Sequence, residues 1–203
     1  MEQEFLENKP CLNSYFGSKS YKITSLKKDF LLYTPKHFPK NNTFSLTRKI
    51  PKSRFIRPPS PYDLFKNNSK LKSYTLLGIG SNQGDSLTIF WKLFLRLKKK
   101  NAIIAYSPFL KNPAFGYTQQ ADFYNGIVWI KTQLCCADFF SFCFYLERIF
   151  GRKRKREFKN APRTLDLDIL GFKNKTIRFK HLCIPHKEWA NRPSVTIPLK
   201  GFL

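Results

Sequence analysis

Residues 75–100, TLLGIGSNQGDSLTIFWKLFLRLKKK, decide the fold of this chain. The first six form an apolar run that ends in glycine, which is the pattern of a buried strand. Polar turn residues follow, and Asp85 is placed to cap the helix that comes next. Ile89, Leu93 and Leu97 recur at helical spacing, and the closing lysines suit a helix C-terminus. This stretch therefore predicts a strand, a tight turn and an amphipathic helix.

The remaining C-terminal part continues this alternation. Apolar and alternating runs predict further strands, and a long apolar segment that ends at Gly151 predicts a second helix. The strands are expected in residues 101–110, 121–132 and 164–172, and the second helix in residues 136–150. The order β-α-β-β-α-β matches the split βαβ, ferredoxin-like arrangement, in which two helices pack on one face of an antiparallel sheet. We therefore predict one α+β domain over residues 73–203.

Residues 1–72 differ in composition. Asn, Lys, Ser and Pro dominate without sustained periodicity, and the four prolines of residues 51–70 each remove a backbone donor. Aromatic residues such as Phe30 and Tyr33 would let part of this segment dock on the domain that follows. We interpret it as a basic, largely irregular extension and expect it to be dispensable for catalysis. An arm that binds nucleic acid or a partner is the alternative.

The charge of the chain is strongly positive. Thirty-seven Lys and Arg against 13 Asp and Glu give a formal net charge of +24 over 203 residues. Residues 1–72 carry 15 basic and 5 acidic side chains (+10), and residues 73–203 carry 22 and 8 (+14). Such an excess attracts phosphate-bearing partners of any kind. Because the surplus is spread over both parts, we favour a compositional bias with an anionic ligand over a dedicated nucleic-acid surface.

The sequence gives little indication of a membrane protein or of a metal site built from cysteines. No stretch approaches the ~18 apolar residues of a membrane span. The first ten residues carry acids where a signal peptide needs a basic and then an apolar region, so a cytoplasmic location is expected. The five cysteines have neither CxxC spacing nor the His partners of a zinc site, and free thiols are expected.

Asp166 and Asp168 carry the strongest chemical signal. They lie two residues apart in a predicted strand, so both carboxylates project from the same face. Adjacent carboxylates repel unless a cation lies between them, and a hard cation such as Mg²⁺ is the natural partner. Seven Lys and Arg within residues 152–163 would hold the phosphates of a metal-bound polyphosphate. The alternative is an exposed edge strand whose acids pair loosely with a solvated basic loop.

These residues resemble the 6-hydroxymethyl-7,8-dihydropterin pyrophosphokinase family. The resemblance covers about residues 74–199. It rests on GSNQGD, GYTQQADFYN, LERIFGRKR, APRTLDLDIL and IPHKEWANRPSVTIPL, which occur in the family's order and at about its spacings. The combination of PRTLDLDIL with an upstream GRxR and a downstream IPH is highly specific.

The resemblance implies a three-layer αβα elaboration of the ferredoxin-like core. It also implies transfer of pyrophosphate from ATP to the hydroxymethyl group of the reduced pterin, giving AMP, with two Mg²⁺ ions, in folate biosynthesis. The expected partners are ATP and 6-hydroxymethyl-7,8-dihydropterin, with no specific nucleic acid and no membrane, and a monomer is expected. Two alternatives stay open: a homologue that binds pterin or nucleotide with weakened catalysis, and a basic nucleic-acid-binding protein.

The resemblance also assigns residues to roles. The catalytic residues it implies are Arg152, Arg163, Asp166 and Asp168, of which the two aspartates hold the metal. The ATP-binding residues are Glu147, Arg154, His186 and Arg192. The pterin-binding residues are Pro113, Gly116, Phe123 and Asn125. One position departs from the family, because Ser194 stands where a Phe often stacks on the second face of the pterin.

Overall fold

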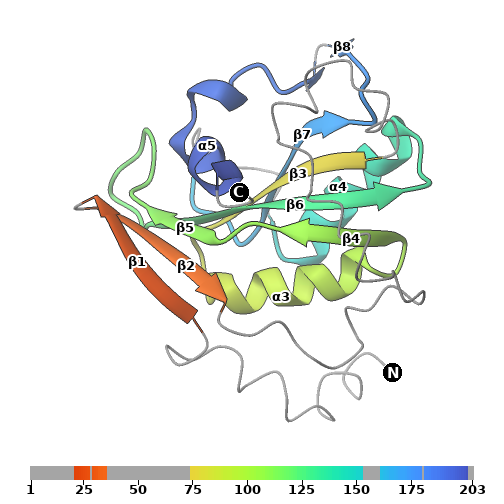
Figure 1. The fold of residues 1–203 in the computed structure, drawn as a ribbon. Helices are drawn as coiled ribbons and strands as arrows, with labels where there is room; N and C mark the ends of the chain where they lie inside the picture. The colour runs from red at the N-terminus through yellow and green to blue at the C-terminus, as the bar shows by residue number, and fades with distance from the viewer. Residues whose placement is uncertain (1–20, 28, 36–73, 153–160, 180, 201–203) are drawn as a thin grey trace, which may run out of the picture.

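A seven-stranded antiparallel sheet forms the centre of the molecule. The structure is a computed structural model and describes residues 21–27, 29–35, 74–152, 161–179 and 181–200. The strands of the sheet are β1 (Tyr21–Lys27), β2 (Phe30–Pro35), β3 (Tyr74–Ser81), β4 (Asn101–Tyr106), β5 (Phe109–Asn112), β6 (Phe123–Thr132) and β7 (Asp166–Phe172) (Figure 1). A separate two-stranded sheet contains β8 (Ile177–Phe179) and β9 (Leu182–Ile184).

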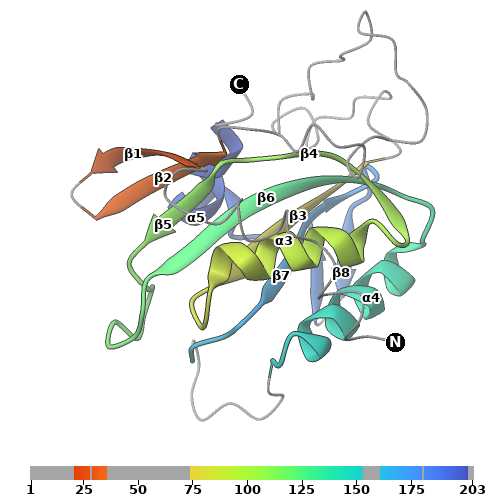
Figure 2. The same cartoon turned by 90° about the horizontal axis from the view of Figure 1, so that it is seen from below.

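Helices cover both faces of the main sheet. They are α3 (Ser86–Leu97), α4 (Cys136–Ile149), α5 (Pro193–Lys200) and the short 3₁₀ helix η5 (Trp189–Asn191). Figure 2 shows α3 and α4 side by side on one face, and Figure 1 shows α5 on the opposite face. The predicted α+β class is confirmed.

The two faces carry separate hydrophobic cores, because side chains alternate along a strand. Leu77 of β3 faces α3 and α4, and it belongs to a cluster with Phe90, Phe94, Phe139 and Leu146. Its neighbour Leu76 points the other way and packs with Ile127, Trp129, Leu170, Val195 and Leu199 under α5. The central strands are therefore buried on both sides, which fixes their register firmly.

The strand order places β3 between β6 and β7. The full order is β1-β2-β5-β6-β3-β7, and β4 also pairs with β6. The single strand expected over residues 101–110 is thus two strands, β4 and β5, on the same edge of β6. Pro108 has no backbone N–H and interrupts the ladder there. Ser107 bridges the gap, since its N–H donates to the Ile127 carbonyl at 2.8 Å and its Oγ accepts from the Ile127 N–H at 2.9 Å.

The turn after β3 forms as its sequence predicts. Asp85 caps α3, and its carboxylate accepts hydrogen bonds from the Thr88 N–H at 3.1 Å and the Thr88 hydroxyl at 2.6 Å. Gly84 has a φ of +78°, a conformation that glycine adopts without the steric cost of a side chain. The helix α5 was not expected from the sequence. It is only eight residues long and contains Pro198, so its pattern gives little helical signal.

The expectation of an irregular N-terminal extension is wrong for residues 21–35. This segment forms the hairpin β1–β2, and β2 pairs with β5 at the edge of the sheet. The expectation that aromatic residues dock it on the domain is confirmed for Tyr33, whose ring lies 5.4 Å from that of Tyr124. The sequence did not predict this hairpin. Its strand β2 is stabilised by backbone pairing with β5, so the hairpin forms without a marked alternation of apolar residues in its own sequence. Residues 1–20, 28 and 36–72 lie outside the described part of the chain.

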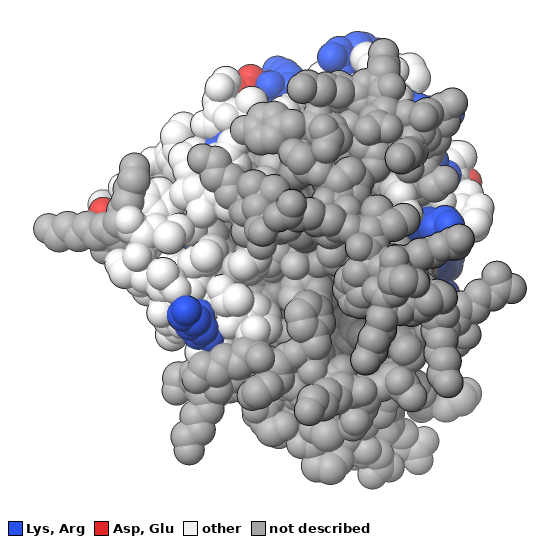
Figure 3. Space-filling model, viewed as in Figure 1, with Lys and Arg blue, Asp and Glu red and all other residues white. Residues whose placement is uncertain are grey.

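On the face drawn in Figure 3, the visible Lys and Arg side chains of the described residues lie in several separate places. None of the helices in the described part of the chain has the length and apolar character that a transmembrane span requires.

Candidate active site

Two glycines of β3 form the floor of the candidate site. In the ladder, Gly80 pairs with Asn125 of β6 on one side and with Asp166 of β7 on the other. Gly78 lies opposite Asp168 in the same way. A Cβ atom on Gly80 would lie 3.2 Å from Asn125 Oδ1 and 3.6 Å from Asp166 Cβ. The missing side chain at Gly80 therefore lets the Asn125 amide on β6 and the Asp166 side chain on β7 approach each other over the backbone of β3.

The two carboxylates project from the face that α5 covers. Leu167, between them in sequence, packs in the core under α3 and α4, whereas Leu170 packs under α5. Because the side-chain period is two, Asp166 and Asp168 share the face of Leu170. The expectation that both point to the same side is confirmed.

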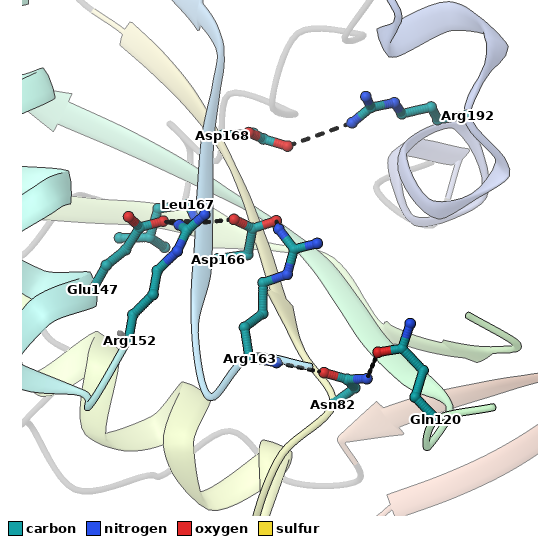
Figure 4. A network of polar contacts seen from close by, with 9 residues as sticks. All are labelled: Asn82, Gln120, Glu147, Arg152, Arg163, Asp166, Leu167, Asp168 and Arg192. Carbon is teal, nitrogen blue, oxygen red and sulfur yellow. Dashed lines mark hydrogen bonds and ion pairs between the residues drawn. The ribbon is translucent and has the colours of Figure 1, made fainter. Parts of the chain in front are cut away.

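Asp166 binds two arginines at once. Its Oδ1 lies 2.9 Å from Arg152 Nη1, and its Oδ2 accepts a hydrogen bond from Arg163 Nη1 at 2.8 Å (Figure 4). All three side chains are largely buried, with exposed fractions between 15% and 23%. The buried Nε of Arg163 has no hydrogen-bond partner among the described residues.

The buried Glu147 binds Arg152. It lies in the last turn of α4 and is 5% exposed. Its Oε1 accepts hydrogen bonds from Arg152 Nη1 and, at 2.9 Å, from the backbone N–H of Leu167. Arg152 is therefore fixed between two carboxylates, Glu147 and Asp166. Glu147 faces the buried side of this arrangement and anchors α4 to β7.

Asp168 has a looser environment than Asp166. Arg192 Nη1 lies 3.6 Å from its Oδ2, beyond hydrogen-bond distance. Partial burial and the neighbouring charge of Asp166 raise the pKa of the Asp168 carboxyl. Burial lowers the pKa of His186, and the charge of Asp168 opposes this shift. The backbone N–H of His186 donates a hydrogen bond to the Leu170 carbonyl at 3.0 Å. Burial and the charge of Asp166 therefore outweigh the opposing charges of His186, Arg192 and Arg163 in setting the pKa of Asp168.

A second group of predicted residues lies across the glycine floor. Phe123 and Asn125 come from the start of β6, and the Arg163 guanidinium lies 5.6 Å from the centre of the Phe123 ring. The amide of Asn125 donates to Asn112 Oδ1 at 2.8 Å, which joins β6 to the end of β5. Arg163 thus contacts both walls of the site, because it binds Asp166 as well.

The remaining predicted residues lie further out or outside the description. Pro113 and Gly116 belong to the exposed loop that follows β5. Arg154 lies outside the described residues. Ser194 is half-buried at the start of α5, two residues after Arg192.

Asn82 was not among the predicted site residues, yet it connects three segments of the site. Its Oδ1 accepts from the Arg163 N–H at 2.8 Å, and its own N–H donates to the Arg163 carbonyl at 3.1 Å. Its Nδ2 donates to Gln120 Oε1 at 2.8 Å and to the Ala121 carbonyl at 3.1 Å. Asn82 lies in GSNQGD, a motif of the family resemblance, but the resemblance assigned no role to this residue.

Replacement of Asn82 by alanine is expected to lower the rate at saturating substrate by about tenfold to a hundredfold, because Arg163 loses its backbone support and a small misplacement is costly. Because Asn82 is buried, we also expect a loss of ~1–3 kcal/mol in unfolding free energy. Steady-state kinetics and urea unfolding measure the two effects. Unchanged kinetics in a variant of reduced stability would contradict the positioning role.

The site can accept a divalent cation, although no dedicated metal cage is present. Within the described ranges, no three His, Cys, Asp or Glu side chains gather closely enough to hold a metal by themselves. Two carboxylates on one face, one with a raised pKa, suit an ion that takes its remaining ligands from water and phosphate. Such incomplete protein coordination is usual for Mg²⁺ bound together with a nucleotide.

The antiparallel sheet with helices on both faces places the chain among α+β proteins. The arginines beside the carboxylates suit phosphate-bearing ligands. A family model described as 7,8-dihydro-6-hydroxymethylpterin-pyrophosphokinase (HPPK) matches residues 76–202. This match covers more than half of the chain. The chain therefore belongs to the HPPK family, and the resemblance stated from its motifs is confirmed.

Curated relatives agree with this membership. A 2-amino-4-hydroxy-6-hydroxymethyldihydropteridine pyrophosphokinase of Helicobacter pylori is 45% identical over 156 residues, which is 76% of this chain and 93% of the relative. The protein of the same name from Campylobacter jejuni is 41% identical over 151 residues, 73% of this chain and 91% of the relative. The Bacillus subtilis protein of that name is 32% identical over 131 residues, 64% of this chain and 77% of the relative.

Proposed function

We propose that this protein transfers pyrophosphate from ATP to the hydroxymethyl group of 6-hydroxymethyl-7,8-dihydropterin in folate biosynthesis. The products are AMP and the pterin pyrophosphate. The observation that carries the proposal is the arrangement of Asp166 and Asp168 on one wall and Asn125 on the other, with Gly80 between them. Membership of the HPPK family supports the same reaction.

In this reaction the hydroxymethyl oxygen attacks the β-phosphorus of ATP in line. The bond between that phosphorus and the oxygen bridging to the α-phosphate breaks, AMP leaves with the electron pair, and the hydroxyl proton is lost. Negative charge grows on the phosphate oxygens, so positive groups placed before the reaction lower the barrier. The arginines of this site can supply that charge.

Arg152 and Arg163 are proposed as the catalytic arginines. Both already lie on one carboxylate, Asp166, within 2.9 Å. Phosphate oxygens offer the same bidentate geometry to guanidinium groups, so the arginines can contact ATP with little movement. Arg163 also lies over Phe123, which lets one side chain touch both substrates.

Asp166 and Asp168 are proposed to hold two Mg²⁺ ions together with the phosphates. When bound, the ions would neutralise phosphate charge and polarise the phosphoryl oxygens. Asp168 fits this role, because the raised pKa of its carboxyl reflects an anion that needs a nearby positive charge. Asp166 fits it as well if one arginine exchanges its carboxylate contact for a phosphate contact.

The other assignments follow the family resemblance. Arg192 and His186, near Asp168, are proposed to bind ATP phosphates, together with Arg154 from the basic segment. Glu147 is proposed to contribute to the nucleotide site through its support of Arg152.

The pterin is proposed to lie against Phe123 and Asn125. Phe123 would stack on the ring system, and the Asn125 amide would pair with its polar edge. The backbone of Pro113 and Gly116 would line the same pocket. Ser194 leaves the second face of the pterin without the aromatic wall common in the family.

We also propose that the fold is a ferredoxin-like core elaborated into three layers. The order of β3 to β7 with α3 and α4 on one face supports a ferredoxin-like core, and α5 supports its elaboration into three layers. We propose that residues 73–203 form the catalytic domain and act as a monomer in the cytoplasm, without specific nucleic acid.

The test is AMP release from the purified protein with ATP and Mg²⁺, measured with and without the reduced pterin. Pterin-dependent AMP is expected, and it should vanish when EDTA removes Mg²⁺. Binding of ATP and pterin without AMP formation would instead favour a homologue that has lost turnover. Ser194, in place of a stacking Phe, is the reason to consider this alternative. Absence of pterin binding would overturn the proposed function.

A further inference from the structure

We propose that the N-terminal hairpin β1–β2 is a positioning element for the pterin side of the site, and that it acts through Tyr33. This inference rests on the proposed function, because it assigns a role in binding the pterin. The family model begins at residue 76, so the hairpin lies outside the part that the family model matches.

The hairpin is joined by its backbone to the strand that precedes the pterin loop. Leu31, Leu32 and Tyr33 of β2 pair with Lys111, Leu110 and Phe109 of β5. Without β2, β5 would be an edge strand of only four residues, held on one side. The loop that carries Pro113 and Gly116 begins where this strand ends. The pairing therefore restrains the start of that loop.

Tyr33 also reaches the strand on the other side of the loop. Its ring meets that of Tyr124 at 5.4 Å, with an interplanar angle of 60°. Tyr124 lies between Phe123 and Asn125, the two proposed pterin residues of β6. Side chains alternate along a strand, so a contact that holds Tyr124 on one face fixes the orientation of its neighbours on the other. Burial and hydrogen bonding with Tyr33 raise the pKa of Tyr124, and both rings are half-buried.

Tyr21 makes the hairpin rigid enough to transmit this support. It is 4% exposed, and its hydroxyl accepts a hydrogen bond from Trp91 Nε1 of α3 at 2.7 Å. Its ring packs on Tyr33 at 6.2 Å and on Phe109 at 6.4 Å. An isolated two-stranded hairpin is marginally stable in water, so these contacts fix it to the domain. Figure 2 shows the hairpin at the β5 edge of the sheet.

The same topology separates the hairpin from the phosphate side. In the sheet order β2-β5-β6-β3-β7, the strand with Asp166 and Asp168 lies at the far end from β2. A loss of hairpin support should therefore weaken pterin binding and leave ATP binding nearly intact. A general loss of stability would weaken both ligands together.

The experiment compares Tyr33→Ala with Tyr33→Phe and with Leu26→Ala in the full chain. Leu26 is an exposed residue of the same hairpin, 43% exposed, and serves as the matched control. Tyr33→Ala is expected to raise the KM and Kd for the pterin about tenfold, equivalent to ~1.4 kcal/mol, a size within the range known for aromatic pairs. The KM for ATP should change by less than about twofold, a difference of ~0.4 kcal/mol. Tyr33→Phe keeps the ring and should restore most of the pterin affinity.

Hydrogen exchange supplies a readout that does not depend on turnover. Tyr33→Ala should speed amide exchange in residues 109–125 and leave residues 166–172 unchanged. An unchanged pterin Kd in Tyr33→Ala, or equal losses for pterin and ATP, would overturn the inference. If the unaltered protein binds the pterin but forms no AMP, the proposed reaction fails while the Kd comparison still tests the hairpin.

Discussion

Replacing Asp168 by asparagine is expected to reduce pterin-dependent AMP formation by about a thousandfold or more, equivalent to ~4 kcal/mol in the activation barrier. Asparagine keeps the shape of the side chain and removes its charge. Because Arg192 lies 3.6 Å away, the carboxylate has no hydrogen-bonded arginine to lose, and its proposed role is to bind a metal ion. The fold should therefore remain intact, with a thermal midpoint close to that of the unaltered protein.

The measurement is AMP release across a range of Mg²⁺ concentrations. A higher Mg²⁺ requirement in Asp168→Asn, with ATP binding in EDTA unchanged, would identify the metal as the missing component. Asp138→Asn in the exposed first turn of α4 provides a control with the same chemical change. Near-normal turnover in Asp168→Asn would contradict the metal assignment.

Replacing Glu147 by leucine is expected to lower the unfolding free energy by about 3–5 kcal/mol, the usual cost of removing one partner from a buried ion pair. The change removes one carboxylate partner of the Arg152 guanidinium and leaves the buried Leu167 N–H without its acceptor. Glu147→Gln keeps an acceptor for that N–H, so its loss should be smaller. Urea unfolding of the three proteins measures both differences.

Activity provides a second measure of the same change. Because Glu147 positions Arg152, both variants should lose rate at saturating substrates, and leucine more than glutamine. The control Asp138→Asn removes an exposed charge from the same helix and should cost less than ~1 kcal/mol. Equal stability of Glu147→Leu and the unaltered protein would show that the buried pair contributes little to the fold.

The secondary structure of the domain was largely predictable because its patterns are long and local. The run 75–80, the helix that ends at Leu97 and the alternation in 123–132 each carry enough periodicity to identify an element. The failures occurred where stability comes from distant residues. The hairpin at 21–35 depends on the edge of β5 and on Trp91, and α5 depends on the apolar face formed by Leu76 and Trp129.

The candidate site divides in the same way. Charged residues such as Asp166, Asp168 and Arg163 were identified because their types and spacing imply phosphate chemistry. Asn82 was overlooked, and so was Asn112. Both act through amide hydrogen bonds to residues up to 81 positions away in sequence, as in the bond between Asn82 and Arg163. No local pattern marks an amide that becomes important only when the chain folds.

The glycine floor has a kinetic consequence. Neighbouring strands lie ~4.8 Å apart, so the backbone positions of Asn125 and Asp166, with Gly80 between them, are held ~10 Å apart by main-chain hydrogen bonds. Effective molarities of about 10⁵–10⁸ M require the reacting atoms themselves to be held ~3–3.5 Å apart. In the proposed reaction, the placement of the pterin relative to the phosphates would depend on strand register as well as on single side chains. A slip of one residue between β3 and β7 would turn both carboxylates to the opposite face and abolish it in a single step.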